Sequence, residues 1–81
     1  MRYFFNEAGG LSLRDDVGFD LPDHNAARIM AVKYAGELLR DHPTLIWSGQ
    51  DFRVEVTGED GLLLFTIVIV GVDAPAVQDA S

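Results

Sequence analysis

The chain contains no cysteine in its 81 residues. No disulfide can therefore stabilise the fold, and no thiolate can act as a nucleophile or metal ligand. A domain of this size buries only roughly 60% of the surface that its unfolded chain exposes, so its core is marginal when it stands alone. The length leaves room for a single domain, which we expect over residues 1–72, with a flexible C-terminal tail over residues 73–81.

Basic residues are scarce, since six Lys and Arg stand against thirteen Asp and Glu and leave a net charge of −7. The basic residues are spread singly along the chain. The average field of the molecule would repel a phosphate backbone, so we expect no direct nucleic-acid partner. Solubility is the ordinary explanation of such acidity.

Long hydrophobic runs are missing as well. The longest one, residues 62–72, is well short of the ~20 residues that span a bilayer, so we expect no membrane partner. The N-terminus lacks the apolar stretch of about 7–15 residues that a secretory signal needs. The absence of cysteine is compatible with a cytoplasmic location.

The most informative segment that is present is a strand predicted over residues 62–70, which is rich in β-branched residues. Both of its faces are apolar: one carries Phe65, Ile67 and Ile69, and the other carries Leu64, Val68 and Val70. A single helix can cover only one of these faces. We therefore expect a homodimer with Leu64, Val68 and Val70 as interface candidates; an unidentified protein partner is the other way to cover them.

Turn signals and hydrophobic periodicity predict an α+β fold of type ββαββ, in which two hairpins flank one helix on one face of a small sheet. The strands are expected at residues 2–6, 11–14 with 19–21, 52–57 and 62–70. The helix is expected from His24 to about Asp41, after a cap at Asp23 and before Pro43. Because the last strand is apolar on both faces, we expect it in the centre of the sheet, beside and parallel to the first, with residues 52–57 at an edge.

The predicted helix has a main apolar side and a second, weaker stripe. The main side follows the spacing of a helix packed on a sheet: Ala27, Met30, Ala31, Tyr34, Ala35 and Leu38. Ile29, Val32 and Gly36 form the stripe that faces away from it. Scattered apolar surface residues are common. A contact with a partner is the alternative, so these three are interface candidates too.

The densest acidic segment holds Asp15, Asp16, Asp20 and Asp23. It suggests an alternative function, a regulatory domain that binds a ligand or a divalent metal through the segment Asp15–Asp23. Its spacing does not match the Asp-x-Asp-x-Asp-Gly calcium loop. Turn formation by Asp15 and Asp16 and helix capping by Asp23 explain most of the segment without any ligand.

No constellation for catalysis, cofactor binding or metal binding is visible in the sequence. His24 and His42 would lie at opposite ends of the helix, ~27 Å apart at about 1.5 Å per residue. The serines have no neighbouring base and no Gly-x-Ser-x-Gly elbow. We therefore expect a protein that is not an enzyme and carries no cofactor.

Several short motifs occur together: Arg2-Tyr3-Phe4-Phe5, Gly9-Gly10, Arg14-Asp15-Asp16-Val17-Gly18, Leu21-Pro22-Asp23 and Arg53-Val54-Glu55-Val56. In this combination the chain resembles a family of short, uncharacterised bacterial proteins, a domain of unknown function. The resemblance extends to about Phe65. It implies a stand-alone cytoplasmic protein of proteobacterial type, with no activity, cofactor or catalytic residue to transfer. The Leu-Pro-Asp turn before the helix is also similar to HicB-type antitoxins, which implies binding of a partner protein as another alternative.

Overall fold

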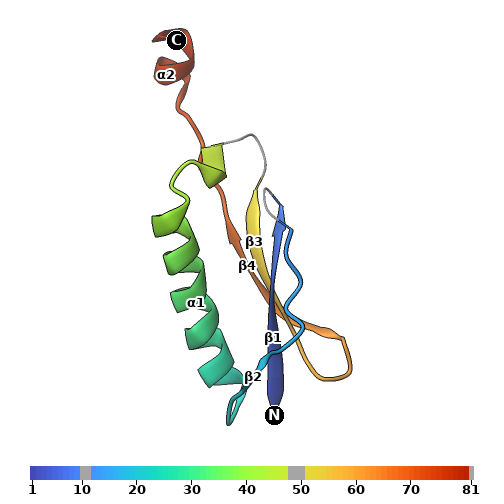
Figure 1. Ribbon diagram of the computed structural model, residues 1–81. Coiled ribbons are helices and arrows are strands. Elements are labelled where there is room, and N and C mark those ends of the chain that lie inside the picture. Colours follow the sequence, from blue (N-terminus) through green and yellow to red (C-terminus); the bar gives the residue numbers. More distant parts are fainter. Residues whose placement is uncertain (10–11, 48–50, 81) are drawn as a thin grey trace.

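The computed structural model describes residues 1–9, 12–47 and 51–80, with residues 78–80 described as backbone only. Its elements follow in the order β1 (Arg2–Gly9), β2 (Phe19–Asp20), α1 (His24–Asp41), the short 3-10 helix η1 (Leu45–Trp47), β3 (Phe52–Thr57), β4 (Leu63–Ile69) and α2 (Pro75–Ala80). This order confirms the predicted α+β arrangement, in which two hairpins flank the main helix (Figure 1).

The strands form one antiparallel sheet in the order β2-β1-β3-β4. In the centre of the sheet Phe5 of β1 lies opposite Val56 of β3, and Val56 lies opposite Phe65 of β4. The predicted strand order is therefore wrong. β4 is an edge strand that runs antiparallel to β3, and β3 is central.

The error in strand order has a physical cause. α1 lies on only one face of the sheet (Figure 1), so a central strand of this fold needs apolar side chains on that face alone. β3 alternates for this reason, and its buried residues are Phe52, Val54 and Val56. Clean alternation is thus compatible with a central strand in a two-layer fold, and apolar residues on both faces do not make β4 central.

The first hairpin is shorter than the sequence predicts. β2 has only two residues, which pair with the start of β1. In the strand expected over residues 11–14, Leu13 makes an isolated bridge to Glu7, and residue 11 lies outside the described part. Between these contacts a loop, not a strand, runs along the outer edge of β1.

The core lies between α1 and the sheet. Its buried apolar residues come from β1, α1 and β3: Tyr3, Phe5, Ala27, Ala31, Ala35, Phe52, Val54 and Val56. The three alanines fall on the predicted apolar side of α1, and their small side chains let the helix approach the large strand residues. Burying each Phe or Val side chain contributes roughly 1.5–3 kcal/mol.

α1 begins and ends as predicted. Oδ1 of Asp23 accepts a hydrogen bond from the backbone N–H of Ala26 at 2.8 Å, which satisfies one of the free amides of the first turn. At the other end the N–H of His42 donates to the carbonyl of Leu38 at 2.8 Å, and Pro43 prevents a further turn.

Beyond α1 the chain folds back over one end of the core. Leu45 and Ile46 of η1 pack against the core, and the Trp47 ring lies so close to Gly71 that a Cβ at residue 71 would be 2.7 Å from it. α2, coloured red in Figure 1, projects from the body of the molecule and lies within the segment expected as the C-terminal tail. No helix in the described part of the chain is both long and apolar enough to cross a membrane.

Candidate functional site

β4 forms an open edge of the sheet. Among the described residues it pairs with β3 alone, and its seven residues include no charged residue and no proline. Phe65, Ile67 and Ile69 pack against the core, on the face expected for them. Val68 and Val70 are 58% and 61% exposed, and alternation directs them away from α1. The strand therefore presents uncovered apolar side chains beside an unpaired backbone edge.

A hollow of 310 Å³ lies between α1 and this edge strand. It is lined by Arg28, Val32, Phe65, Thr66 and Ile67. The guanidinium carbon of Arg28 lies 5.5 Å from the centre of the Phe65 ring, a cation–π contact that joins α1 to β4. Val32 is 63% exposed. The helix surface next to β4 thus exposes an apolar side chain on the helix-covered side of the sheet, the side opposite to Val68 and Val70.

The other interface candidates on α1 are exposed as well, but they do not share one surface. Val32 lines the hollow beside β4, whereas Ile29 lines a groove on the opposite side of the helix. Gly36 follows Val32 by one helical turn, and an added Cβ there would meet nothing within 4 Å. Leu64, the remaining candidate on β4, is partly buried against the core.

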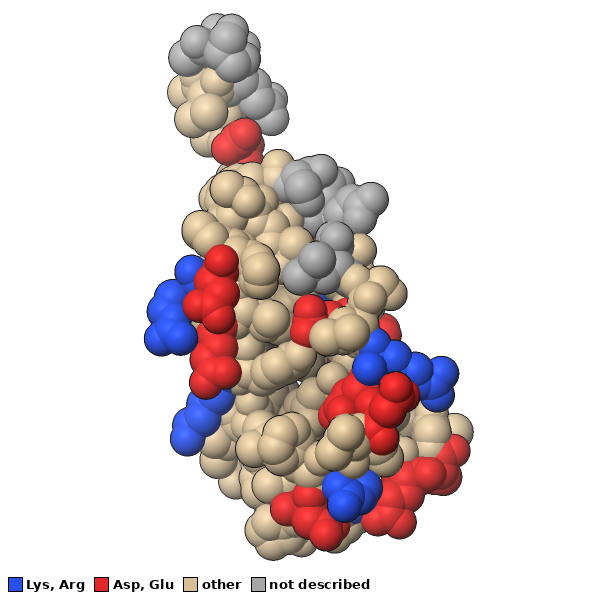
Figure 2. Space-filling model, in the orientation of Figure 1, with Lys and Arg blue, Asp and Glu red and all other residues tan. Residues whose placement is uncertain are grey.

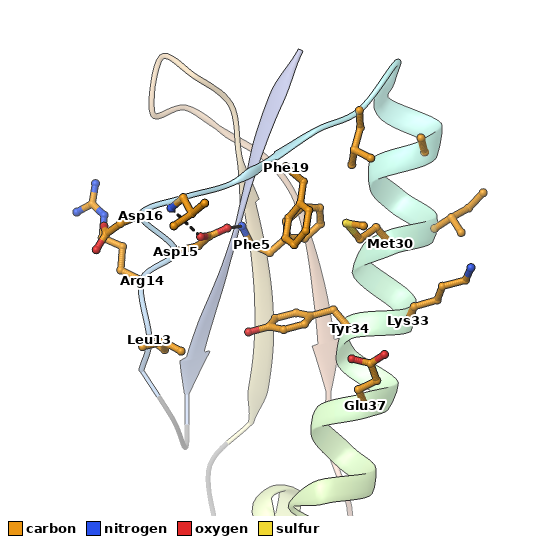
Figure 3. Close-up of a pocket in the computed structure, with 14 residues that line it drawn as sticks. Phe5, Leu13, Arg14, Asp15, Asp16, Phe19, Met30, Lys33, Tyr34 and Glu37 are labelled. Carbon is orange, nitrogen blue, oxygen red and sulfur yellow. Dashed lines mark hydrogen bonds between the residues drawn. The ribbon is translucent and has the colours of Figure 1, made fainter.

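The groove on the other side of α1 has a volume of 680 Å³. It lies between the helix, β1 and the loop that precedes β2. Figure 3 shows Phe5, Phe19 and Met30 together in its middle, with the Tyr34 ring reaching from α1 toward β1 and Lys33 pointing away. The rings of Phe5 and Phe19 meet edge to face at 5.9 Å, a geometry that aromatic pairs favour. The groove is thus apolar in its middle, with Lys33 and Glu37 among its lining residues.

A buried acid lies next to the groove. Glu7 is only 6% exposed, and its carboxylate accepts a hydrogen bond from the Tyr34 hydroxyl. Burial and this neighbouring carboxylate raise the pKa of Tyr34 well above its usual 10.0, so the hydroxyl remains a donor. The alternation of Tyr3, Phe5 and Glu7 along β1 places all three on the helix-facing side, which is the sequence signal that could have identified Glu7 as buried.

The loop before β2 is held by the carboxylate of Asp15. Its oxygens accept hydrogen bonds from the backbone N–H groups of Phe5 at 3.1 Å, Val17 at 3.0 Å and Gly18 at 3.0 Å. Burial alone would raise the pKa of Asp15. The three amides and the positive charge of Arg2 outweigh burial, so the pKa lies below its usual 3.8. A longer β2 would have placed a backbone carbonyl next to the N–H of Phe5. The Asp15 carboxylate accepts this hydrogen bond in its place.

The remaining acids of the segment Asp15–Asp23 do not converge on one point. Asp23 caps α1, and Asp16 and Asp20 are exposed. Among the side chains of residues 1–9, 12–47 and 51–77, no group of three or more His, Asp or Glu is placed to hold a metal ion. The structure confirms that Asp15 forms the predicted turn and that Asp23 forms the predicted cap.

The two histidines lie at opposite ends of α1, as expected. The Nδ1 of His24 is 2.7 Å from the hydroxyl of the buried Tyr3, so this histidine joins the start of the helix to β1. His42 is exposed after the last turn. Ser12 is exposed in the loop after β1, whereas Ser48 and Ser81 lie outside the described residues.

Charged side chains are mixed on the face drawn in Figure 2. The basic groups, in blue, lie beside acidic groups, in red, both along α1 and around the loops at the lower right. That face therefore carries no continuous basic surface of the kind that binds a phosphate backbone.

One protein family accounts for most of the chain. Its model, described as a domain of unknown function (DUF6894), matches residues 2–70. The chain belongs to this family. The match spans β1 to β4 and includes α1, so the DUF6894 fold comprises the sheet, its open edge and the groove, and α2 lies beyond it. No curated protein and no solved structure gives a significant match.

Proposed function

We propose that this DUF6894 chain is a small non-enzymatic protein-interaction domain that acts as a homodimer. The observation that supports it is the open edge strand β4, where Val68 and, directly after the strand, Val70 are more than half exposed on the helix-free side. Fully burying a side chain of this size contributes roughly 1.5–3 kcal/mol. Association sites typically expose several apolar side chains on one surface.

The electrostatics of β4 also favour association of like chains. Each chain carries a net charge of −7, so two copies repel each other wherever their acidic surfaces meet. β4 has no charged residue, and the charged residues opposite it on β3 are one of each sign, Arg53 opposite Val68 and Glu55 opposite Thr66. Contact along β4 therefore keeps the acidic loop Asp15–Asp20 of each copy, on the other edge of the sheet, away from its partner.

Light scattering over a concentration series tests the proposal. The purified chain should approach twice its monomer mass as the concentration rises from micromolar to millimolar. Val68→Glu should remain a monomer and stay folded, because residue 68 is exposed and lies opposite Arg53, whose Nε makes no hydrogen bond and only a 3.6 Å ion pair with Asp51. A wild-type chain that remains monomeric at millimolar concentration would refute the homodimer.

A second candidate function is supported by the groove. Its volume of 680 Å³ lies within the usual range for small-molecule sites, about 300–1,000 Å³, and its lining includes Asp15 and Asp16. A ligand-binding regulatory domain would use this groove. Thermal melting with a panel of divalent ions, benzylamine and benzoate separates it from the first proposal, since a probe at about 100 times its Kd adds about 2.7 kcal/mol to the folded state. Unchanged melting with every probe would argue against it.

The setting implied by the resemblance belongs to the same proposal. We infer a bacterial, cytoplasmic domain whose partner is first of all a second copy of the chain. Neither proposed function needs a nucleic acid, a membrane or a cofactor. A pull-down from the native cell with wild type and Val68→Glu would reveal an additional protein partner that uses the same strand.

A further inference from the structure

We propose that two copies of the chain pair antiparallel through the outer edges of β4, so that their sheets become one continuous sheet with both α1 helices on the same face. This inference rests on the homodimer proposed above. The homodimer alone leaves the contact surface open, because two helix-free faces packed against each other would also produce a dimer. The inference assigns the contact to the edge of β4.

The two edges of the sheet differ in how far they are closed. At one edge β2 is only two residues long. Beside it the backbone N–H of Phe5 in β1 donates a hydrogen bond to the Asp15 carboxylate, which closes this edge further. At the other edge β4 runs for seven residues with a partner on one side only, among the residues described. Natural edge strands are usually protected by charge, proline or short length, and β4 has none of these. Its alternate N–H and C=O groups point outward and need an acceptor and a donor.

A second copy of β4 fits this edge by composition. When both helices lie on the same face, side chains that point the same way oppose each other across the new strand pair. Every residue of β4 except Thr66 is aliphatic or aromatic, so nearly all opposing pairs are apolar and no like charges meet. The partner that this edge accepts is therefore an uncharged apolar strand, which the chain itself provides.

The position of α1 supports the same partner. The helix packs on β3 and β4, and the hollow lined by Arg28 and Val32 opens beside β4. Strands are about 4.8 Å apart, so a symmetric β4 neighbour would bring the two helix axes to roughly 10 Å, close to the usual 8–10 Å of packed helices. Val32 of each chain would then lie in the space between the helices. Gly36, one turn further, has nothing near its Cβ position and would let the backbones approach closely.

The size of this contact predicts a weak dimer. β4 is about 23 Å long at roughly 3.3 Å per residue, and the molecule measures 20 Å across its shorter axes. An edge of these dimensions buries roughly 900 Å² in total, below the about 1,200–2,000 Å² of stable specific interfaces and within the range of weak, transient ones. We therefore expect dissociation in the micromolar range or above, with Ile29 and the groove left outside the contact.

Amide hydrogen exchange, measured by NMR on samples of known mass, tests the pairing. In the dimer every β4 amide should exchange slowly, including the alternate amides that point away from β3. Dilution to monomer, or the Val68→Glu variant, should restore fast exchange at the outward amides only. Val32→Glu should lower the dimer fraction as well. Ile29→Glu, an equal change on the groove side of the same helix, should leave mass and exchange unaltered.

The outcomes separate this inference from the homodimer on which it rests. Mass doubling with outward β4 amides that still exchange rapidly would overturn edge pairing and leave the homodimer standing. Monomer mass at every concentration would overturn both. A loss of dimer in Ile29→Glu with none in Val32→Glu would assign the contact to the groove side and refute the edge.

Discussion

The hydroxyl of Tyr34 on α1 donates a hydrogen bond to the buried carboxylate of Glu7 on β1. The bond connects the helix to a central strand beside the aromatic groove. A buried carboxylate is costly unless its oxygens are satisfied, so this donor decides whether the acid is tolerated. The pair therefore makes the stability of the domain depend on this contact between α1 and β1.

Tyr34→Phe should destabilise the fold by about 1–3 kcal/mol, because it leaves a buried acceptor without its donor. Urea unfolding of wild type and variant measures the difference. Glu7→Gln is the matched control, since the amide oxygen still accepts from Tyr34 and the loss should be much smaller. Equal stability of Tyr34→Phe and wild type would mean that the hydrogen bond does not form in solution.

Asp15→Asn should destabilise the domain by about 1 kcal/mol or more at neutral pH, because hydrogen bonds to a charged acceptor are stronger than those to a neutral one. The folded pKa of Asp15 lies below its usual 3.8. Its ionised form therefore stabilises the fold above pH ~4, and this contribution is lost as the pH falls through the lowered folded value.

Unfolding measured at several pH values should show the difference between wild type and Asp15→Asn shrinking as the pH falls below ~4. Asp16→Asn changes the neighbouring exposed carboxylate and serves as the control for net charge. A difference that does not depend on pH would contradict the assignment to the Asp15 carboxylate.

Asp23→Ala should cost ~1 kcal/mol of stability through loss of the cap at the start of α1. Asp23→Ser keeps an acceptor for the Ala26 amide and should retain most of that stability. Thermal melting by circular dichroism measures both variants, and light scattering should show that neither changes the dimer. If Asp23→Ala lost binding of an ion while melting normally, the residue would be a ligand and not a cap.

Gly36→Ala should stabilise the isolated chain by up to about 1 kcal/mol, since glycine is unfavourable within a helix and the added methyl meets nothing. In the proposed dimer the same methyl would separate the helices and reduce the dimer fraction. Unfolding in dilute solution and light scattering at high concentration measure the two effects. Gly71→Ala is the contrast, because its Cβ would meet the Trp47 ring at 2.7 Å and should destabilise the chain. A Gly36→Ala chain less stable than wild type in dilute solution would contradict the open surroundings of this residue.

The limits of α1 and the alternation in the second half of β4 could be predicted because their signals are local, whereas Leu64, expected on the open face, packs against the core beside a register shift. Asp23 and Pro43 bracket the helix, and alternation alone separates Ile67 from Val68. The role of Asp15 was harder to predict, since its acceptor function depends on an amide of β1 that β2 leaves unpaired. The sequence could not indicate that β2 would be so short.

The sequence by itself determined the fold class, the extent of the main helix and the presence of one strand with two apolar faces. These features depend on backbone preferences and spacing within a few residues. Only the tertiary structure decided that β3 is central and β4 is at the edge, because pairing between distant segments and coverage by α1 are properties of the whole chain. That decision leaves the apolar strand β4 open, so the surface that we propose for association is a consequence of strand order and not of composition.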